Sequence, residues 1–172
     1  MKMIKKGAGF TLIELIIAVI MSAIIIFAIL SVITFTEAEL HASSISQGIQ
    51  MDLILLSRQI AEGVFEPGGQ SFGLLEAVSY DTLISGQVTF TGIDGNNRSF
   101  NTNATTVTYS SPMAAPITTI YKAPLNSILL VEFTNIANDC VGVNISITRD
   151  FNGRSLTGAI STSIYLRNVP QV

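Results

Sequence analysis

Uncharged residues run without interruption from Leu15 to Thr36, and nearly all of them are apolar. At about 1.5 Å per helical residue, a run of this length crosses a hydrocarbon core of roughly 30 Å. Lys2, Lys5 and Lys6 precede the run, and basic residues before a span favour a cytoplasmic amino terminus. The pattern predicts one transmembrane helix, with the bulk of the chain outside the cytoplasm.

Beyond the span the apolar residues form a helical stripe. The stripe consists of Ile45, Ile49, Leu53, Leu56 and Ile60, at spacings of four, four, three and four. Such spacing puts the side chains on one face of a helix. We expect the helix to continue through residues 37–62 as an amphipathic segment that docks on a folded domain.

The pattern then changes to glycine-rich sequence and finally to alternation. Five glycines and prolines between residues 63 and 73 indicate the end of the helix, and residues 63–86 are expected to form a connector loop. From Gln87 onward, short alternating runs predict strands. The clearest pair flanks the turn residues 150–153. The sequence therefore predicts an α+β fold in which a C-terminal antiparallel sheet, residues 87–172, packs on the helix.

Composition agrees with a membrane segment joined to one small polar domain. Only 12% of the 172 residues are charged, against about 25% in ordinary soluble domains. The formal net charge is −3, and the three lysines of residues 1–9 make the rest of the chain more acidic still. Clustered Lys and Arg, which a phosphate-binding face requires, are missing. We therefore expect no direct binding of nucleic acid.

Residue types that carry catalysis or bind metals are scarce. His41 is the only histidine and Cys140 the only cysteine, so neither a Ser-His-Asp arrangement nor a multi-histidine metal site is available within one chain. We expect Cys140 to be a buried apolar residue. Asp94, Asn96 and Asn97 are candidate calcium ligands, but a segment of this composition is more typical of a turn. The sequence predicts no enzyme, no metal site and no cofactor.

One motif stands directly before the span. Gly9-Phe10-Thr11-Leu12-Ile13-Glu14 follows the short basic leader, and Glu14 is the only charged residue between Lys6 and Glu37. The motif resembles the processing site of type IV pilin-like proteins, a family of pilins, minor pilins and the pseudopilins of type II secretion. The matching residues extend from about Lys5 to Ile33.

The resemblance implies specific roles for three residues. A prepilin peptidase would cut between Gly9 and Phe10 and so remove the leader, residues 1–9. The new amino terminus at Phe10 would be N-methylated, and Glu14 would guide subunit docking. The resemblance further implies assembly through residues 10–36, with other pilin or pseudopilin subunits, membrane lipid and an inner-membrane platform with its ATPase as partners.

A physical argument supports a role for Glu14. Cleavage turns the neutral amide nitrogen of Phe10 into an ammonium group, and methylation leaves that charge in place. Opposite charges 4 Å apart attract by about 1 kcal/mol in water and by about 4 kcal/mol at an effective dielectric constant near 20. Glu14 can meet its own terminus or that of a neighbour. Pairing with a neighbour would make the carboxylate a gauge of axial register between subunits.

Alternatives remain for the same segment. A cleaved secretory signal is disfavoured, because the apolar run is too long and lacks a clear small-residue cleavage site at its end. An uncleaved signal anchor has the same orientation and differs only in the motif. Ser31 stands where major pilins commonly have a kink-forming proline, which favours a minor pilin or a pseudopilin.

The expected function is a structural subunit of a type IV pilus or a type II secretion pseudopilus. Such a subunit would be a single-pass protein of the inner membrane, with its head outside the cytoplasm, before it enters the filament. The alternative is a membrane-anchored binding or adhesion protein that does not polymerise.

Overall fold

The structure is a computed structural model that describes residues 11–66, 69–82, 86–112 and 117–168. Its only α-helix among these residues is α1, Leu12–Glu62. The chain divides into two compact units, Met1–His41 and Ala42–Val172. The fold class is α+β, as the sequence predicts: one long N-terminal helix is followed by antiparallel sheets.

The first unit contains the apolar part of α1. In the part of the chain that the structure describes, α1 is the one helix long and apolar enough to cross a membrane, and the side chains of its most apolar stretch are exposed. The hydroxyls in this stretch bond within the helix: Ser22, Ser31 and Thr36 each donate to the carbonyl oxygen four residues earlier, at 2.7, 2.9 and 2.8 Å. These hydroxyls therefore need no outside partner.

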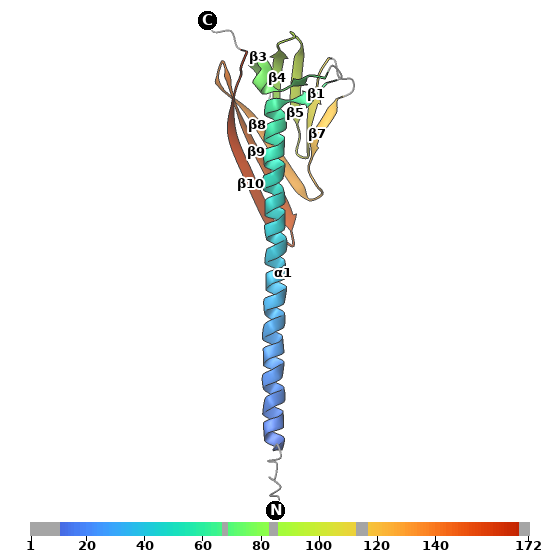
Figure 1. Ribbon diagram of the computed structural model, residues 1–172, viewed down its shortest axis with the longest axis vertical. Coiled ribbons are helices and arrows are strands. Elements are labelled where there is room, and N and C mark those ends of the chain that lie inside the picture. Colours follow the sequence, from blue (N-terminus) through green and yellow to red (C-terminus); the bar gives the residue numbers. More distant parts are fainter. Residues whose placement is uncertain (1–10, 67–68, 83–85, 113–116, 169–172) are drawn as a thin grey trace, which may run out of the picture. The chain divides into compact units, whose positions relative to one another are not determined.

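The second unit contains two larger antiparallel sheets (Figure 1). The five-stranded sheet has the order β3-β4-β5-β6-β7, and the three-stranded sheet has the order β10-β9-β8. Their strands are β3 (Ala77–Asp81), β4 (Gln87–Gly92), β5 (Asn97–Thr102), β6 (Thr106–Ser110), β7 (Thr118–Lys122), β8 (Ser127–Ala137), β9 (Cys140–Phe151) and β10 (Arg154–Tyr165).

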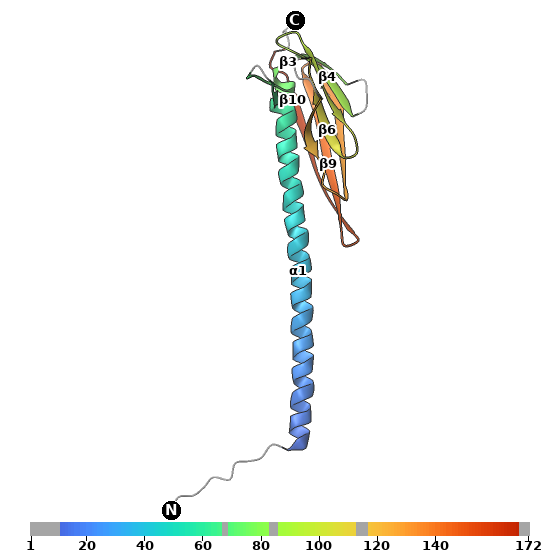
Figure 2. The same ribbon diagram turned by 90° about the vertical axis from the view of Figure 1, so that its right-hand side faces the viewer.

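Residues 42–62 of α1 lie along these sheets (Figure 2), and the apolar stripe packs against them. Ile49, Leu53, Leu56 and Ile60 are buried and Ile45 is partly buried, so the predicted docking face is confirmed. A side chain at Gly158 of β10 would force its neighbours to shift, because a Cβ there would lie 2.6 Å from a methyl carbon of Ile49. The missing side chain lets the helix approach the sheet closely.

The hairpin of β9 and β10 confirms the strand pair that the sequence predicts on either side of residues 150–153. Twelve consecutive residue pairs join the strands, from Phe151 with Arg154 to Cys140 with Tyr165. The connecting residues Asn152 and Gly153 both have positive φ, 48° and 76°. Positive φ at both central positions defines a type I′ turn, whose twist matches that of the two strands.

Residues 63–86 are more structured than the expected connector. They contain the short pair β1 (Val64–Phe65) and β2 (Ser71–Phe72), one 3₁₀ turn (Leu74–Glu76) and strand β3. Gly63 has a φ of 93°, and a Cβ there would lie 2.0 Å from the backbone of Phe72. The glycine thus ends α1 and lets β2 fold back against the helix end, where Leu74 is fully buried.

Candidate assembly and processing site

Glu14 lies in the first turn of α1 and is hydrogen-bonded to Thr11. The Thr11 amide and hydroxyl both donate to Glu14 Oε2, each at 2.9 Å, and the Glu14 amide donates to Thr11 Oγ1 at 3.4 Å. This reciprocal arrangement is a capping box, which satisfies amide groups that the first turn of a helix leaves unpaired. Glu14 therefore stabilises the start of the helix within its own chain.

The other two residues of the predicted site, Gly9 and Phe10, lie outside the described residues. Phe10 directly precedes Thr11, so the amino group that cleavage would create belongs to the residue next to the cap. Glu14 Oε2 accepts both Thr11 bonds, whereas Oε1 accepts none from the described residues. The carboxylate can thus cap the helix and still present one oxygen to a cation.

The pattern of the capping box was already present in the sequence. A threonine followed three residues later by a glutamate, just before an apolar run, predicts a helix start. The motif predicts a docking role for Glu14, and the structure adds this local role at the start of the helix. Capping and docking require different properties of the side chain at position 14. A glutamine can cap a helix but has no charge with which to attract a cation.

The apolar surface after Glu14 is the second component of the site. Leu12 is 78% exposed and Phe27 is 75% exposed, and the large aliphatic side chains between them are exposed as well. A surface of this kind is unstable in water, so it requires lipid or other apolar helices around it. Between Glu14 and Glu37 the described helix offers no charged residue, so contacts along this surface depend on packing.

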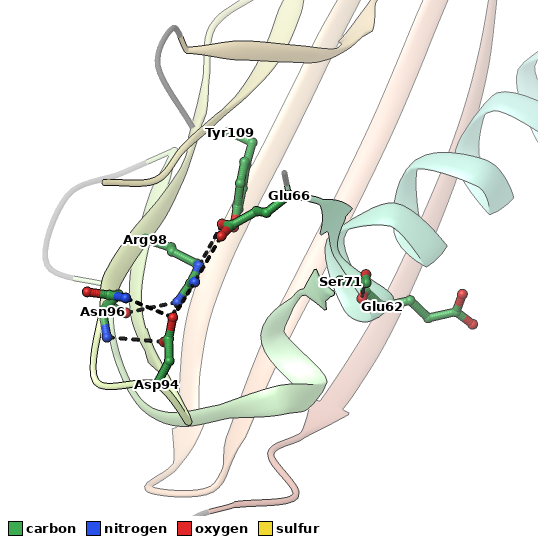
Figure 3. A network of polar contacts seen from close by, with 7 residues as sticks. All are labelled: Glu62, Glu66, Ser71, Asp94, Asn96, Arg98 and Tyr109. Atoms are coloured by element: carbon green, nitrogen blue, oxygen red, sulfur yellow. Dashed lines mark hydrogen bonds and ion pairs between the residues drawn. The ribbon is translucent and has the colours of Figure 1, made fainter. Parts of the chain in front are cut away.

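A buried ionic network that the sequence patterns do not predict lies in the second unit (Figure 3). The Arg98 side chain is fully buried and donates two hydrogen bonds to Glu66, at 2.8 and 3.1 Å. It donates two more to Asp94, both at 2.7 Å. Its guanidinium carbon lies 3.6 Å from the ring centroid of Phe72. Tyr109 donates to Glu66 at 2.5 Å and completes the network.

The electrostatics of this network indicate a structural role. Hydrogen bonds from Arg98 lower the pKa of Glu66 to about 2, against the effect of burial, and they lower the pKa of Asp94 too. Burial, together with the bond to Glu66, raises the pKa of Tyr109. Carboxylates held ionised in this way are poor proton donors near neutral pH. Both oxygens of Asp94 serve Arg98, which fits the turn reading of residues 94–97 better than a calcium site.

A second polar cluster connects α1 with β9 and β7. Arg149 donates to Asp52, and Tyr121 donates to the same carboxylate at 2.9 Å. The Arg149 side chain passes over Gly48, where a Cβ would lie 3.3 Å from its Nη1. Cys140 is buried, as the sequence predicts. Within the described ranges, no group of three or more His, Cys, Asp and Glu residues could hold a metal ion.

Comparison of the chain with family models, with curated proteins and with solved structures finds no match. The structure itself has a long N-terminal apolar helix, whose outer part packs on antiparallel sheets. This plan is compatible with a pilin-like protein. Among the described residues, α1 is long and apolar enough to span a membrane. The unit Ala42–Val172 contains the end of α1 and the antiparallel sheets.

Proposed function

We propose that the chain is a structural subunit, a minor pilin or a pseudopilin, of a type IV pilus or a type II secretion pseudopilus. A prepilin peptidase removes residues 1–9, the amino group of Phe10 is methylated, and the mature chain assembles through its N-terminal helix. Before assembly the protein spans the inner membrane once, with residues 42–172 outside the cytoplasm.

The observation that carries the proposal is where the motif stands relative to the helix. The block Gly9 to Glu14 runs into α1, which begins at Leu12, and the apolar helix that follows leaves its side chains exposed. A cut at Gly9 would thus place a new positive charge within one turn of the only carboxylate in this part of the chain. An ordinary signal anchor has no need of that arrangement.

Assembly in this scheme depends on packing and register. Exchange of lipid for protein around an apolar helix yields little hydrophobic free energy, so shape and polar contacts decide which subunits associate. Glu14 Oε1, which accepts no hydrogen bond from the described residues, is suited to accept one from the terminal ammonium of a neighbour. The driving force for extraction from the membrane would come from an assembly platform and its ATPase, and sister subunits would supply the other helices.

The first test is the amino-terminal mass of the protein isolated from its native membrane, from cells with and without the prepilin peptidase. The proposal expects a start at methylated Phe10 that depends on the peptidase. A chain that keeps residues 1–9 in both strains would instead identify a signal anchor, which is the non-polymerising alternative.

Two variants separate the capping role of Glu14 from its docking role. Glu14→Gln keeps a side chain that can complete the capping box but removes the charge. Thr11→Val removes the cap but keeps the charge. If docking depends on the carboxylate, Glu14→Gln is processed normally and fails to enter filaments, while Thr11→Val enters them. Normal assembly of Glu14→Gln would reject charge pairing as the register device.

A further inference from the structure

Strand β10 has a free edge, on which no other described strand pairs. This edge supports an inference beyond the proposed function. Strand β10 ends the three-stranded sheet and is twelve residues long, with an unbroken register to β9 (Figure 1). No charged residue and no proline occurs between Ser155 and Tyr165. A long, regular, uncharged edge strand is a ready template for pairing with another strand.

The hairpin geometry determines which backbone groups face away from β9. A two-residue turn is closed by a hydrogen-bonded pair, here Phe151 with Arg154, and hydrogen-bonded pairs then recur at every second residue. The amides of Leu156, Gly158 and Ile160 thus point toward β9. The N–H and C=O groups that point the other way belong to Ser155, Thr157, Ala159, Ser161, Ser163 and Tyr165.

Contacts just beyond the strand confirm this alternation. Leu166 donates to Asp139 on the β9 side at 2.8 Å, whereas Arg167 donates to Leu75 on the other side at 3.0 Å. The outward amide at position 167 is therefore occupied by the 3₁₀ turn. In the part of the chain that the structure describes, no backbone hydrogen bond reaches the six outward residues of β10.

The other edges of the two larger sheets are protected. Strands β3 and β7 have only five residues each, and the register with their neighbours is interrupted in both cases. Strand β8 is covered in part, because Leu129 donates to the carbonyl oxygen of Ala104 at 2.8 Å. Short, bulged or covered edges resist strand addition. Strand β10 has none of these protections.

A shallow groove of about 400 Å³ adjoins this edge on the outer face of the same sheet. Its lining includes Leu130, Ser146, Ala159 and Ser161, so two residues of the free edge also form the groove wall. A strand paired with β10 would place every second side chain on this face. Small or apolar side chains fit there, because the lining residues on β9 and β10 are uncharged. The charged lining residue, Glu132, lies on β8, two strands from the edge.

The geometry points to strand addition: the β10 edge binds an extended, uncharged segment of a neighbouring, different subunit, whose small or apolar side chains lie beside the groove. The inference rests on the proposed function for the presence of that neighbour. Residues 42–62 of α1 and β10 run in the same direction (Figures 1 and 2). Antiparallel pairing of two β10 edges would thus oppose the helices of two copies, which does not fit insertion in one orientation.

Residue-resolved amide hydrogen exchange of the full chain tests the inference. The protein is compared in its assembled form and dispersed in detergent. The six outward amides should exchange at least about 10-fold more slowly in the assembled form, whereas the inward amides of β10 should be protected in both. This alternation with a period of two residues is the signature of an added strand.

A variant pair at Ala159 checks the cause. Ala159→Pro removes one outward N–H and leaves the bonds to β9 in place, so the protection of Thr157 and Ser161 in the assembled form should disappear. Ala159→Ser keeps the N–H and should behave like the parent protein. Ala159→Lys keeps the backbone but adds a charge on the groove face, and it serves if the proline variant does not fold.

Disulfide cross-linking of cysteines introduced at Ile29 reports separately on assembly through the helix. Helix cross-links together with alternating protection of β10 support strand addition. Helix cross-links without that protection overturn strand addition and leave the proposed function intact. Absence of both overturns both. Mass spectrometry of photo-cross-links from Ser161 identifies the neighbour, and a link to β10 of a second copy would overturn the choice of a different subunit.

Discussion

The described residues of the first unit, 11–41, and the second unit, residues 42–172, handle apolar and polar groups in opposite ways. In the first unit the apolar side chains lie outside and each hydroxyl bonds to its own helix. In the second unit the apolar side chains form a core, and polar groups bond across long stretches of sequence, as Glu66 does with Arg98. The helix of the first unit thus satisfies its own polar groups but requires lipid or other apolar helices around it. The second unit instead buries its apolar side chains in a core of its own.

A substitution should therefore have different consequences in the two units. Loss of an exposed apolar side chain in the first unit should change association with other molecules and leave the fold intact. Loss of a buried side chain in the second should destabilise the domain itself. Unfolding of the domain can be followed by tyrosine fluorescence, because the chain has four tyrosines and no tryptophan.

The largest effect is expected from Arg98→Met. The methionine fills a similar volume but leaves the buried Glu66 without its cation. Removal of one partner of a buried ion pair costs about 3–5 kcal/mol. Urea denaturation of the full chain in detergent should show this loss in the free energy of unfolding.

Arg58→Met provides the matched control for Arg98→Met. Arg58 pairs with Glu62 at 2.8 Å on an exposed helix face, where ion pairs contribute little. Equal destabilisation by the two variants would show that burial does not decide the strength of the Arg98 network.

The next effect concerns the docking stripe of α1. Leu56 is fully buried and its neighbour Leu55 is 51% exposed. Leu56→Ala should lower the free energy of unfolding by about 2–5 kcal/mol through lost burial and a cavity. Leu55→Ala should change it by less than about 0.5 kcal/mol. A large effect of Leu55→Ala in the dispersed protein would mean that the helix docks through another face.

Most of the fold follows from patterns that are local in sequence. The period of the stripe from Ile45 to Ile60 predicts both the helix and its docking face, since each side chain obeys the same 3.6-residue repeat. Alternation and the turn residues predict the hairpin of β9 and β10. Strands β1 and β2 were not predicted, because two residues are too few to produce a pattern. Strand β3 was not predicted either, because its five residues, Ala77–Asp81, show no clear alternation of apolar and polar side chains.

The candidate site and the buried Arg98 network were predictable to different extents. The motif and the span are contiguous in sequence, so Gly9, Phe10 and Glu14 could be named, and the capping box of Thr11 was equally legible. The partners of Arg98 could not be named from the sequence. Glu66 lies 32 residues away along the chain, and only folding brings it close. The free edge of β10 likewise depends on sheet order, which alternation does not determine.

A smaller effect is expected from acid. The pKa of Glu66 is lowered from its ordinary value of 4.5 to about 2, so its ionised form stabilises the folded state. That contribution is complete above pH 4.5 and is lost as the pH falls toward 2. The loss should be on the order of 3 kcal/mol. Urea denaturation at a series of pH values measures it.

Glu66→Gln is the control for the acid series. This variant should be less stable at neutral pH and should lose less stability between pH 4.5 and 2, the interval set by the two pKa values of Glu66. Asp94 remains in the variant and contributes in the same direction, because its pKa is lowered as well. An unchanged acid response in Glu66→Gln would assign the response to other carboxyl groups.

The smallest effect compares one substitution in the two units. The Ser31 hydroxyl donates to Phe27 of its own helix, at 2.9 Å, and that carbonyl group keeps its ordinary helical bond without it. The Ser71 hydroxyl donates to the carbonyl oxygen of Glu62 at 2.6 Å (Figure 3), at the end of α1, where carbonyl groups lack helical donors. Ser71→Ala should therefore lower the free energy of unfolding by about 1 kcal/mol, whereas Ser31→Ala should leave it unchanged.

The Ser31→Ala variant should also behave predictably in the assembled protein. If Ser31 bonds only within its helix, Ser31→Ala should form helix cross-links as readily as the parent chain. Fewer cross-links would mean that the hydroxyl turns to a neighbouring helix on assembly, as small polar residues do between membrane helices. The first unit would then share with the second the use of polar groups across a packed interface, with the interface supplied by another molecule.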